Sequence, residues 1–163
     1  MIVNALMISK GHRTDTRLHL VLESSSDFSR TLIFDGSTLG NLQGAHEGAL
    51  LSACADALRA SQKLGKDEVV TADNGIQVRT VSFEQLVKER LDGPVFMLDR
   101  KGVDIREQTL AEDVVFLLTD HVPMPKKAFN SLKRQGVMNL SLGPVVLHAS
   151  QCISVIHNEL DRR

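Results

Sequence analysis

The chain has 163 residues, of which 42% are hydrophobic, so it is long enough for one ordinary domain with a substantial core. Its 19 Lys and Arg residues are balanced by 20 Asp and Glu residues, which excludes a strongly basic nucleic-acid coat protein but not a local basic patch. No apolar run approaches the roughly 20 residues that span a bilayer, and the N-terminus does not look like a secretory signal. We therefore expect a single domain over residues 1–163, located in the cytoplasm.

The first half of the chain alternates short strand patterns with helical patterns. Strands show as alternating polar and apolar side chains or as short apolar runs, and helices show as apolar positions at helical spacing. A serine at position 82 is a typical N-cap for the second helix. The pattern predicts strands over 17–22, 31–34 and 76–81, and helices over 45–64 and 83–91.

Three apolar strands dominate the second half. They are predicted over 95–98, 114–118 and 137–142, and the first two are almost wholly apolar, as strands covered on both faces are. Helices are predicted over 125–135 and 149–160. Strands that alternate with helices predict an α/β fold with a mostly parallel sheet and helices on both faces.

The loops after these three strands are the expected place for a ligand, because open parallel sheets bind ligands beyond the carboxyl ends of their strands. The loops cover residues 99–102, 119–123 and 143–148, and each mixes polar side chains with glycine or proline. The glycine-rich signatures of dinucleotide and phosphate sites are absent from the sequence, as is a nucleophile elbow. The pattern alone therefore predicts a ligand site at three strand ends.

Several residues in this region have two readings. Asp120 and His121 are either an acid–base pair or a turn with an Asx-type hydrogen bond. Cys152 fits a core position, as free cysteines usually do. The basic pairs at 126–127 and 133–134 either contact phosphates or form a solvated helix face. The six histidines show no metal-ligand spacing, so no metal is expected.

Taken together, the loop sequences resemble a known enzyme family. The resemblance rests on Phe116–His121 (FLLTDH), Ser141–Pro144 (SLGP), Leu147–Ile153 (LHASQCI) and His157–Asp161 (HNELD), with Arg13–Arg17 (RTDTR) near the N-terminus. These segments resemble the archaeal tRNA pseudouridine N1-methyltransferases and their bacterial homologues, which belong to the SPOUT superfamily. The resemblance covers essentially the whole chain.

The resemblance implies a deep trefoil knot in the C-terminal half, S-adenosylmethionine bound in a bent shape within it, and a homodimer that shares its RNA site. The RNA partner would be a structured RNA, most directly a tRNA, and no metal or membrane is involved. Carried over residue by residue, the cofactor contacts fall on Leu98, Thr119, Leu142, Gly143, Leu147 and Cys152.

Two kinds of residue are assigned from their chemistry. Asp120 is the candidate to take the proton from N1 of pseudouridine, because that N–H must be lost during methyl transfer. Arg13, Arg17 and Arg30 are candidates for gripping RNA phosphates, since the guanidinium fork suits that geometry. For each arginine the alternative is a surface salt bridge.

The chain departs from the family pattern at two points. It starts inside the family's first helix, so we expect either that Met1 is a mis-assigned start or that the N-terminal strand of the family is missing. Thr119 stands where the archaeal relatives have glycine. Two alternative functions stay open: a SPOUT enzyme with another RNA target, such as rRNA or a ribose 2′-oxygen, and a non-catalytic homologue that binds RNA or the cofactor without transferring a methyl group.

Overall fold

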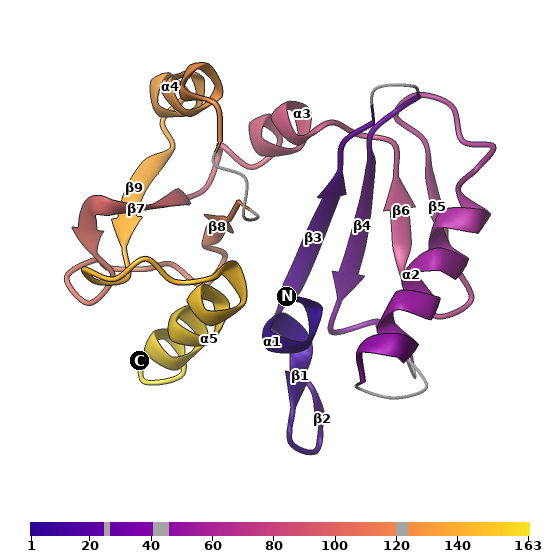
Figure 1. Ribbon diagram of the computed structural model, residues 1–163, viewed down its shortest axis with the longest axis horizontal. Coiled ribbons are helices and arrows are strands. Elements are labelled where there is room, and N and C mark those ends of the chain that lie inside the picture. The colour runs from indigo at the N-terminus through magenta and orange to yellow at the C-terminus, as the bar shows by residue number, and fades with distance from the viewer. Residues whose placement is uncertain (25–26, 41–45, 120–123) are drawn as a thin grey trace. The chain divides into compact units, whose positions relative to one another are not determined.

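A computed structural model of the chain describes residues 1–24, 27–40, 46–119 and 124–163 (Figure 1). The described residues fall into two compact units, which we treat separately. One unit covers residues 2–86, and the other covers residues 87–163 together with Met1. Within the described ranges, no helix combines the length and the apolar character needed to cross a membrane.

The N-terminal unit is built around a four-stranded antiparallel sheet with the strand order β3-β4-β6-β5. Its central strand β4 buries Leu32 and Phe34 completely. The sheet is preceded by one helical turn and a two-stranded hairpin. The elements are α1 (Ile2–Leu6), β1 (Met7–Ile8), β2 (Gly11–His12), β3 (Arg17–Leu22), β4 (Arg30–Asp35), α2 (Glu47–Ala60), β5 (Val69–Thr71) and β6 (Gln77–Arg79), followed by α3 (Phe83–Lys88), which spans the boundary between the units.

The antiparallel sheet corrects one sequence-based expectation. A mostly parallel sheet was predicted for the whole chain, but all strand pairs of the N-terminal unit are antiparallel. The reason is the connections: β3 and β4 are joined by a loop too short for a parallel crossover, which needs a dozen or more residues. Helix α2 does separate β4 from β5, but β5 then pairs at the edge with the strand that follows it.

The C-terminal unit contains the parallel sheet, with the strand order β8-β7-β9. Every element predicted for this part of the chain is present. They are β7 (Val95–Asp104), β8 (Val115–Leu117), α4 (Lys126–Arg134), β9 (Met138–Ser141) and α5 (Ala149–Leu160). Strand β7 pairs with both neighbours and is therefore the central strand of this sheet (Figure 1).

The core of the C-terminal unit joins the sheet to α5. Phe96, Leu140 and Ile156 are almost fully buried in one cluster with Ile105, and the ring of Phe96 stacks on Phe116 with 6.1 Å between centroids. The apolar face predicted for α5 is thus largely buried in the core of this unit. This packing fixes α5 against the sheet and brings the start of the helix to the ends of the strands.

Candidate cofactor site at the strand ends

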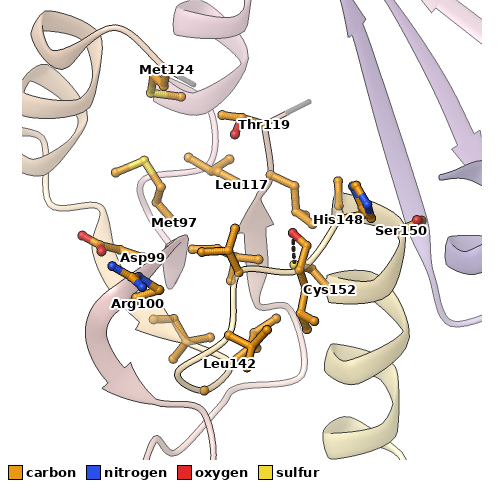
Figure 2. Close-up of a pocket in the computed structure, with 18 of the residues that line it drawn as sticks. Met97, Asp99, Arg100, Leu117, Thr119, Met124, Leu142, His148, Ser150 and Cys152 are labelled. Atoms are coloured by element: carbon orange, nitrogen blue, oxygen red, sulfur yellow. Dashed lines mark hydrogen bonds between the residues drawn. The ribbon is translucent and has the colours of Figure 1, made fainter. Parts of the chain in front are cut away.

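A pocket of about 940 Å³ lies at the carboxyl ends of the parallel strands (Figure 2). Its volume is at the upper end of the range, roughly 300–1,000 Å³, that small-molecule and cofactor sites occupy. The wall is largely apolar. It is formed by residues from the ends of all three strands, from the loop before α5 and from α4, among them Met97, Leu98, Leu117, Leu118, Leu140, Leu142, Leu147 and Phe129.

A bulge in β7 supplies the first polar part of the wall. Leu140 of β9 pairs with Leu98 before the bulge and with Val103 after it, so residues 99–102 loop out of the sheet. Gly102 makes this possible, because a Cβ atom there would lie 2.5 Å from the backbone nitrogen of Leu140. The bulge brings Asp99 and Arg100 to the pocket.

Asp99 is held in place by two hydrogen bonds. The amide of Asn139 on β9 donates to one carboxylate oxygen over 2.8 Å, and the backbone N–H of Lys101 donates to the other over 3.0 Å. The side-chain oxygen of Asn139 is buried and has no partner among the described residues. A fixed carboxylate in the wall of a largely apolar pocket suits a ligand that combines an apolar part with a positive charge.

The loop after β9 turns sharply at Gly143. Its φ of +119° is in the region that side-chain-bearing residues rarely adopt, and a Cβ atom there would meet no protein atom within 4 Å. The turn is stabilised by a hydrogen bond of 3.2 Å from the backbone N–H of Gly143 to the hydroxyl of Ser141. Glycine therefore allows the backbone turn and also leaves the adjoining pocket space free of a side chain.

Cys152 closes the pocket from the first turn of α5. Its backbone N–H donates to the carbonyl of His148 over 2.9 Å, so the amide belongs to the helix and the side chain is what faces the pocket. Burial raises the pKa of the Cys152 thiol, so it stays protonated at neutral pH. Its Sγ lies 3.9 Å from the carbonyl oxygen of Leu147 (Figure 2). Cys152 is thus a neutral residue of the pocket wall.

All six residues expected to contact the cofactor line this one pocket. They are Leu98, Thr119, Leu142, Gly143, Leu147 and Cys152. They come from segments far apart in the sequence, and the parallel sheet brings them together. Their direct contact with a cofactor stays a prediction. Asp120, the candidate proton acceptor, lies outside the described residues.

The three arginines expected to bind RNA lie in the N-terminal unit, and each faces a carboxylate. Arg13 is 3.9 Å from Asp15, Arg30 is 2.7 Å from Asp27, and Arg17 forms an ion pair with the aspartate at position 35. Their role in RNA binding stays a prediction.

Sequence reasoning did not assign the pocket residues that come from α4 and the segment before it. Met124 and Phe129 also line the pocket. Phe129 looks like an ordinary apolar helix position in the sequence, and Met124 precedes the predicted helix. Asp99 and His148 belong to loops that were singled out, but nothing in the pattern gave either a role. No group of three or more His, Cys, Asp and Glu side chains suited to a metal occurs within the described ranges.

The parallel sheet with an apolar pocket at its carboxyl edge defines an α/β protein that binds a small organic molecule or cofactor. The comparisons with known proteins then give the family. A family model described as "Putative SAM-dependent RNA methyltransferase" matches residues 1–163. The chain therefore belongs to this family of S-adenosylmethionine-dependent RNA methyltransferases.

Two relatives agree with this assignment. A protein of Photobacterium profundum is 53% identical over 161 residues, which cover 98% of this chain and 81% of that protein. One of Vibrio atlanticus is 51% identical over 163 residues, covering 99% and 82%. Both are named "Putative pseudouridine methyltransferase".

The fold resembles that of Archaeoglobus fulgidus Nep1, which was crystallised with S-adenosylhomocysteine. The TM-score is 0.54 at 11% sequence identity, so this likeness concerns the fold alone. It covers 88% of this chain, which spans 61% of the length of that solved chain.

The pocket residues fit S-adenosylmethionine, the cofactor of this family. Leucine side chains suit the flat adenine ring, Gly143 leaves open space beside the backbone, and Asp99 offers a carboxylate for the cationic groups of the cofactor.

Proposed function

We propose that this enzyme transfers the methyl group of S-adenosylmethionine to N1 of a pseudouridine in a structured RNA. The observation that carries the proposal is the convergence of the six cofactor candidates, from separate strand ends and α5, on one pocket. The names of the relatives at about 50% identity support the choice of pseudouridine as the acceptor.

The chemistry asks little of the protein beyond alignment. Bound S-adenosylmethionine supplies a methyl group on an activated sulfonium, so the residues around it have to hold the acceptor in line with that methyl group. The leucines at positions 98, 142 and 147 bind the apolar part of the cofactor and exclude water. Cys152 packs beside them as a neutral thiol.

One proton has to be removed during the transfer. The cofactor, when bound, would supply the methyl group and keep the electron pair of the broken bond on its sulfur, and a group of the protein would have to accept the N1 proton of the base. Pseudouridine N1–H is far more acidic than a ribose hydroxyl, so a carboxylate of ordinary basicity suffices as the acceptor. We assign this role to Asp120, and Asp99 is the alternative that the described part of the pocket offers.

Single-turnover measurements on the variants Asp120→Asn and Asp99→Asn distinguish the roles of the two carboxylates. The residue that takes the proton should, when replaced, slow methyl transfer by about 10²-fold or more while changing cofactor affinity by less than about threefold. If Asp99→Asn weakens cofactor binding without further slowing the bound complex, Asp99 only positions the cofactor. If neither variant slows transfer, no carboxylate of this loop pair accepts the proton.

The same proposal includes the finer expectations drawn from the resemblance. The RNA is a tRNA, the enzyme acts in the cytoplasm as a homodimer, and its C-terminal half forms a trefoil knot. The two compact units work together as one SPOUT domain, because a single family model spans both.

The decisive experiment compares two transcripts that differ at one position. One carries pseudouridine there and the other carries uridine, whose N1 is already bonded to the sugar. Each is incubated with the enzyme and radiolabelled cofactor, and the digested nucleosides are separated and identified by mass spectrometry. We expect N1-methylpseudouridine from the first transcript and no methylated nucleoside from the second.

Two other outcomes would overturn the proposal in different ways. Equal methylation of both transcripts would exclude N1 as the acceptor and favour a ribose or another base. Binding of cofactor and RNA without any transfer, tested also with total tRNA and rRNA, would favour the non-catalytic homologue.

A further inference from the structure

Helix α4 has an unusual charge distribution. Its nine residues include Lys126, Lys127, Lys133 and Arg134 and no Asp or Glu. All four cationic side chains are exposed. The sequence contains no Asp or Glu anywhere from position 121 to position 158, although the chain has 20 of them in total. Helix α4 therefore lies within a long stretch without negative charge.

These four cations lack the carboxylate partners that the arginines of the N-terminal unit have. Within the described ranges, none of the four forms a salt bridge. Arg134 donates from Nε to the backbone carbonyl of Asn130 over 3.3 Å, and the Nζ of Lys133 lies 5.4 Å from the centre of the Phe129 ring. Both contacts leave the positive charges available to an external anion.

The same helix forms part of the pocket wall. Phe129 lines the pocket, and Leu132 anchors the helix in the unit with 3% of its surface exposed. Lys133 packs over the ring of this wall residue. A polyanion bound along α4 would thus lie immediately beside the place where the methyl group is transferred.

Helix stability does not explain the first two lysines. Lys126 and Lys127 occupy the first turn of α4, where the helix dipole is positive and favours acidic side chains. Lysines at these positions interact unfavourably with the helix dipole, and their like charges repel each other. A binding role for them accounts for this placement, because phosphates attract the charges that the helix itself disfavours.

We propose that α4 is the surface of this enzyme that binds the RNA backbone, with its four cations contacting phosphates next to the pocket. This inference rests on the proposed function in taking RNA as the acceptor, but it does not depend on which atom is methylated. Contacts of this kind position the RNA without reading its sequence.

The test is the double variant Lys126→Gln/Lys127→Gln in the full-length protein. The matched control is Lys63→Gln/Lys66→Gln, which removes two exposed lysines from the N-terminal unit. Filter binding to a structured tRNA transcript is measured over a series of salt concentrations. We expect the α4 variant to bind at least tenfold more weakly at low salt. The slope of log affinity against log salt concentration should become less negative by about 1 to 2, since each phosphate contact contributes roughly 0.7–0.9 to the magnitude of this slope.

Two further readouts separate a binding role from a structural one. The melting temperature of the α4 variant should be equal to or above that of the wild type, and its affinity for S-adenosylmethionine should be unchanged. The control should bind RNA within about twofold of the wild type.

The inference is overturned if the α4 variant keeps wild-type affinity and salt dependence, if the control loses as much affinity, or if the wild type binds no structured RNA. A failure of the pseudouridine assignment is recognised separately. The wild type would then bind the transcript and leave its pseudouridine unmethylated, while the comparison between the two variants would remain valid.

Discussion

Gly143 combines two properties that the cofactor loop needs. It adopts a φ of +119°, and it leaves the space beside its backbone free of protein atoms. Valine at this position would strain the turn, at a cost of about 1–3 kcal/mol, and would place a branched side chain in the pocket space that we assign to the cofactor. We expect Gly143→Val to weaken S-adenosylmethionine binding by at least tenfold in isothermal titration calorimetry.

Gly136 provides the matched control for this change. It has a φ of +100° just after α4, and a Cβ atom there would also meet nothing within 4 Å. It does not line the pocket. Gly136→Val should therefore carry a similar backbone strain, visible as a lower melting temperature, and leave cofactor affinity within about threefold. Equal loss of binding in both variants would point to general strain and against a specific role of the Gly143 loop.

Asp35 at the end of β4 makes the stability of the N-terminal unit dependent on pH. Hydrogen bonds from Ser37 and from Arg17 lower the pKa of Asp35 from its ordinary 3.8 to about 2. A carboxylate with a lowered pKa stabilises the folded state above its unfolded pKa and loses this effect as the pH falls through its folded pKa. The contribution should be complete above about pH 5 and should be lost progressively as the pH falls toward about 1.

The Asp35→Asn variant tests this in thermal melts between pH 2 and pH 7. We expect it to be less stable than the wild type at pH 6, by on the order of 1 kcal/mol because solvent screens the exposed Arg17, and the difference should shrink steadily between pH 5 and pH 2. Asp27→Asn is the comparison, since its exposed pair with Arg30 contributes less. A difference that is independent of pH would contradict the assignment.

At the scale of elements, the bulge in β7 links the sheet to the pocket. Gly102→Ala would place a Cβ atom within 2.5–2.7 Å of the β9 backbone, which cannot move aside without breaking the pairing of the strands. We expect a loss of about 1–3 kcal/mol in the free energy of unfolding, measured by urea denaturation. Because Asp99 belongs to the same bulge, cofactor affinity should fall as well.

Gly48→Ala is a useful reference for Gly102→Ala. This exposed position in α2 has room for a methyl group, whose nearest neighbour would be the side chain of His46 at 3.5 Å. Alanine is the better helix former, so the variant should gain up to about 1 kcal/mol. If Gly102→Ala behaved in the same way, the bulge would be adaptable and the close approach unimportant.

The sequence predicts elements well where a periodic apolar pattern is long. Helix α5 begins and ends where its apolar face predicts, at Ala149 and Leu160. Strand β7 runs six residues past its predicted end at Leu98, because residues 99–104 are mostly polar and look like a loop until their pairing with β9 is known. The hairpin of β1 and β2 and the short strand β5 are too brief to show a period.

Some features of the candidate site can likewise be predicted from the sequence, and others depend on the three-dimensional fold. The strand-end loops follow from a general rule about parallel sheets, and the family resemblance selects residues within them. The hydrogen bond from Asn139 to Asp99 depends on the register between two strands 40 positions apart in the sequence, which no local pattern encodes. The part of the wall formed by Phe129 likewise depends on how α4 folds back over the sheet.

At the scale of the whole molecule, the proposed homodimer has a direct test. The apolar face of α5 packs largely within its own unit, where Ile153 and Ile156 are buried, which leaves little of that face for contact with a partner subunit. We expect light scattering at micromolar concentration to give about twice the chain mass of 17.9 kDa. A monomer mass under these conditions would contradict both the dimer and an RNA site shared between subunits.

The strand order β8-β7-β9 has a consequence for the time course of folding. Strands β3 and β4 are close neighbours along the chain, so pairing them closes only a short loop. Strands β7 and β9 are far apart in the sequence, so pairing them closes a much longer one. Long-range parallel pairing is intrinsically slow. In pulsed hydrogen exchange during refolding, we expect amides of β3 and β4 to become protected before those of β7 and β9. The pocket would then be the last feature of the enzyme to mature, and a newly made chain would spend its earliest moments with an ordered hairpin and no capacity to hold its cofactor.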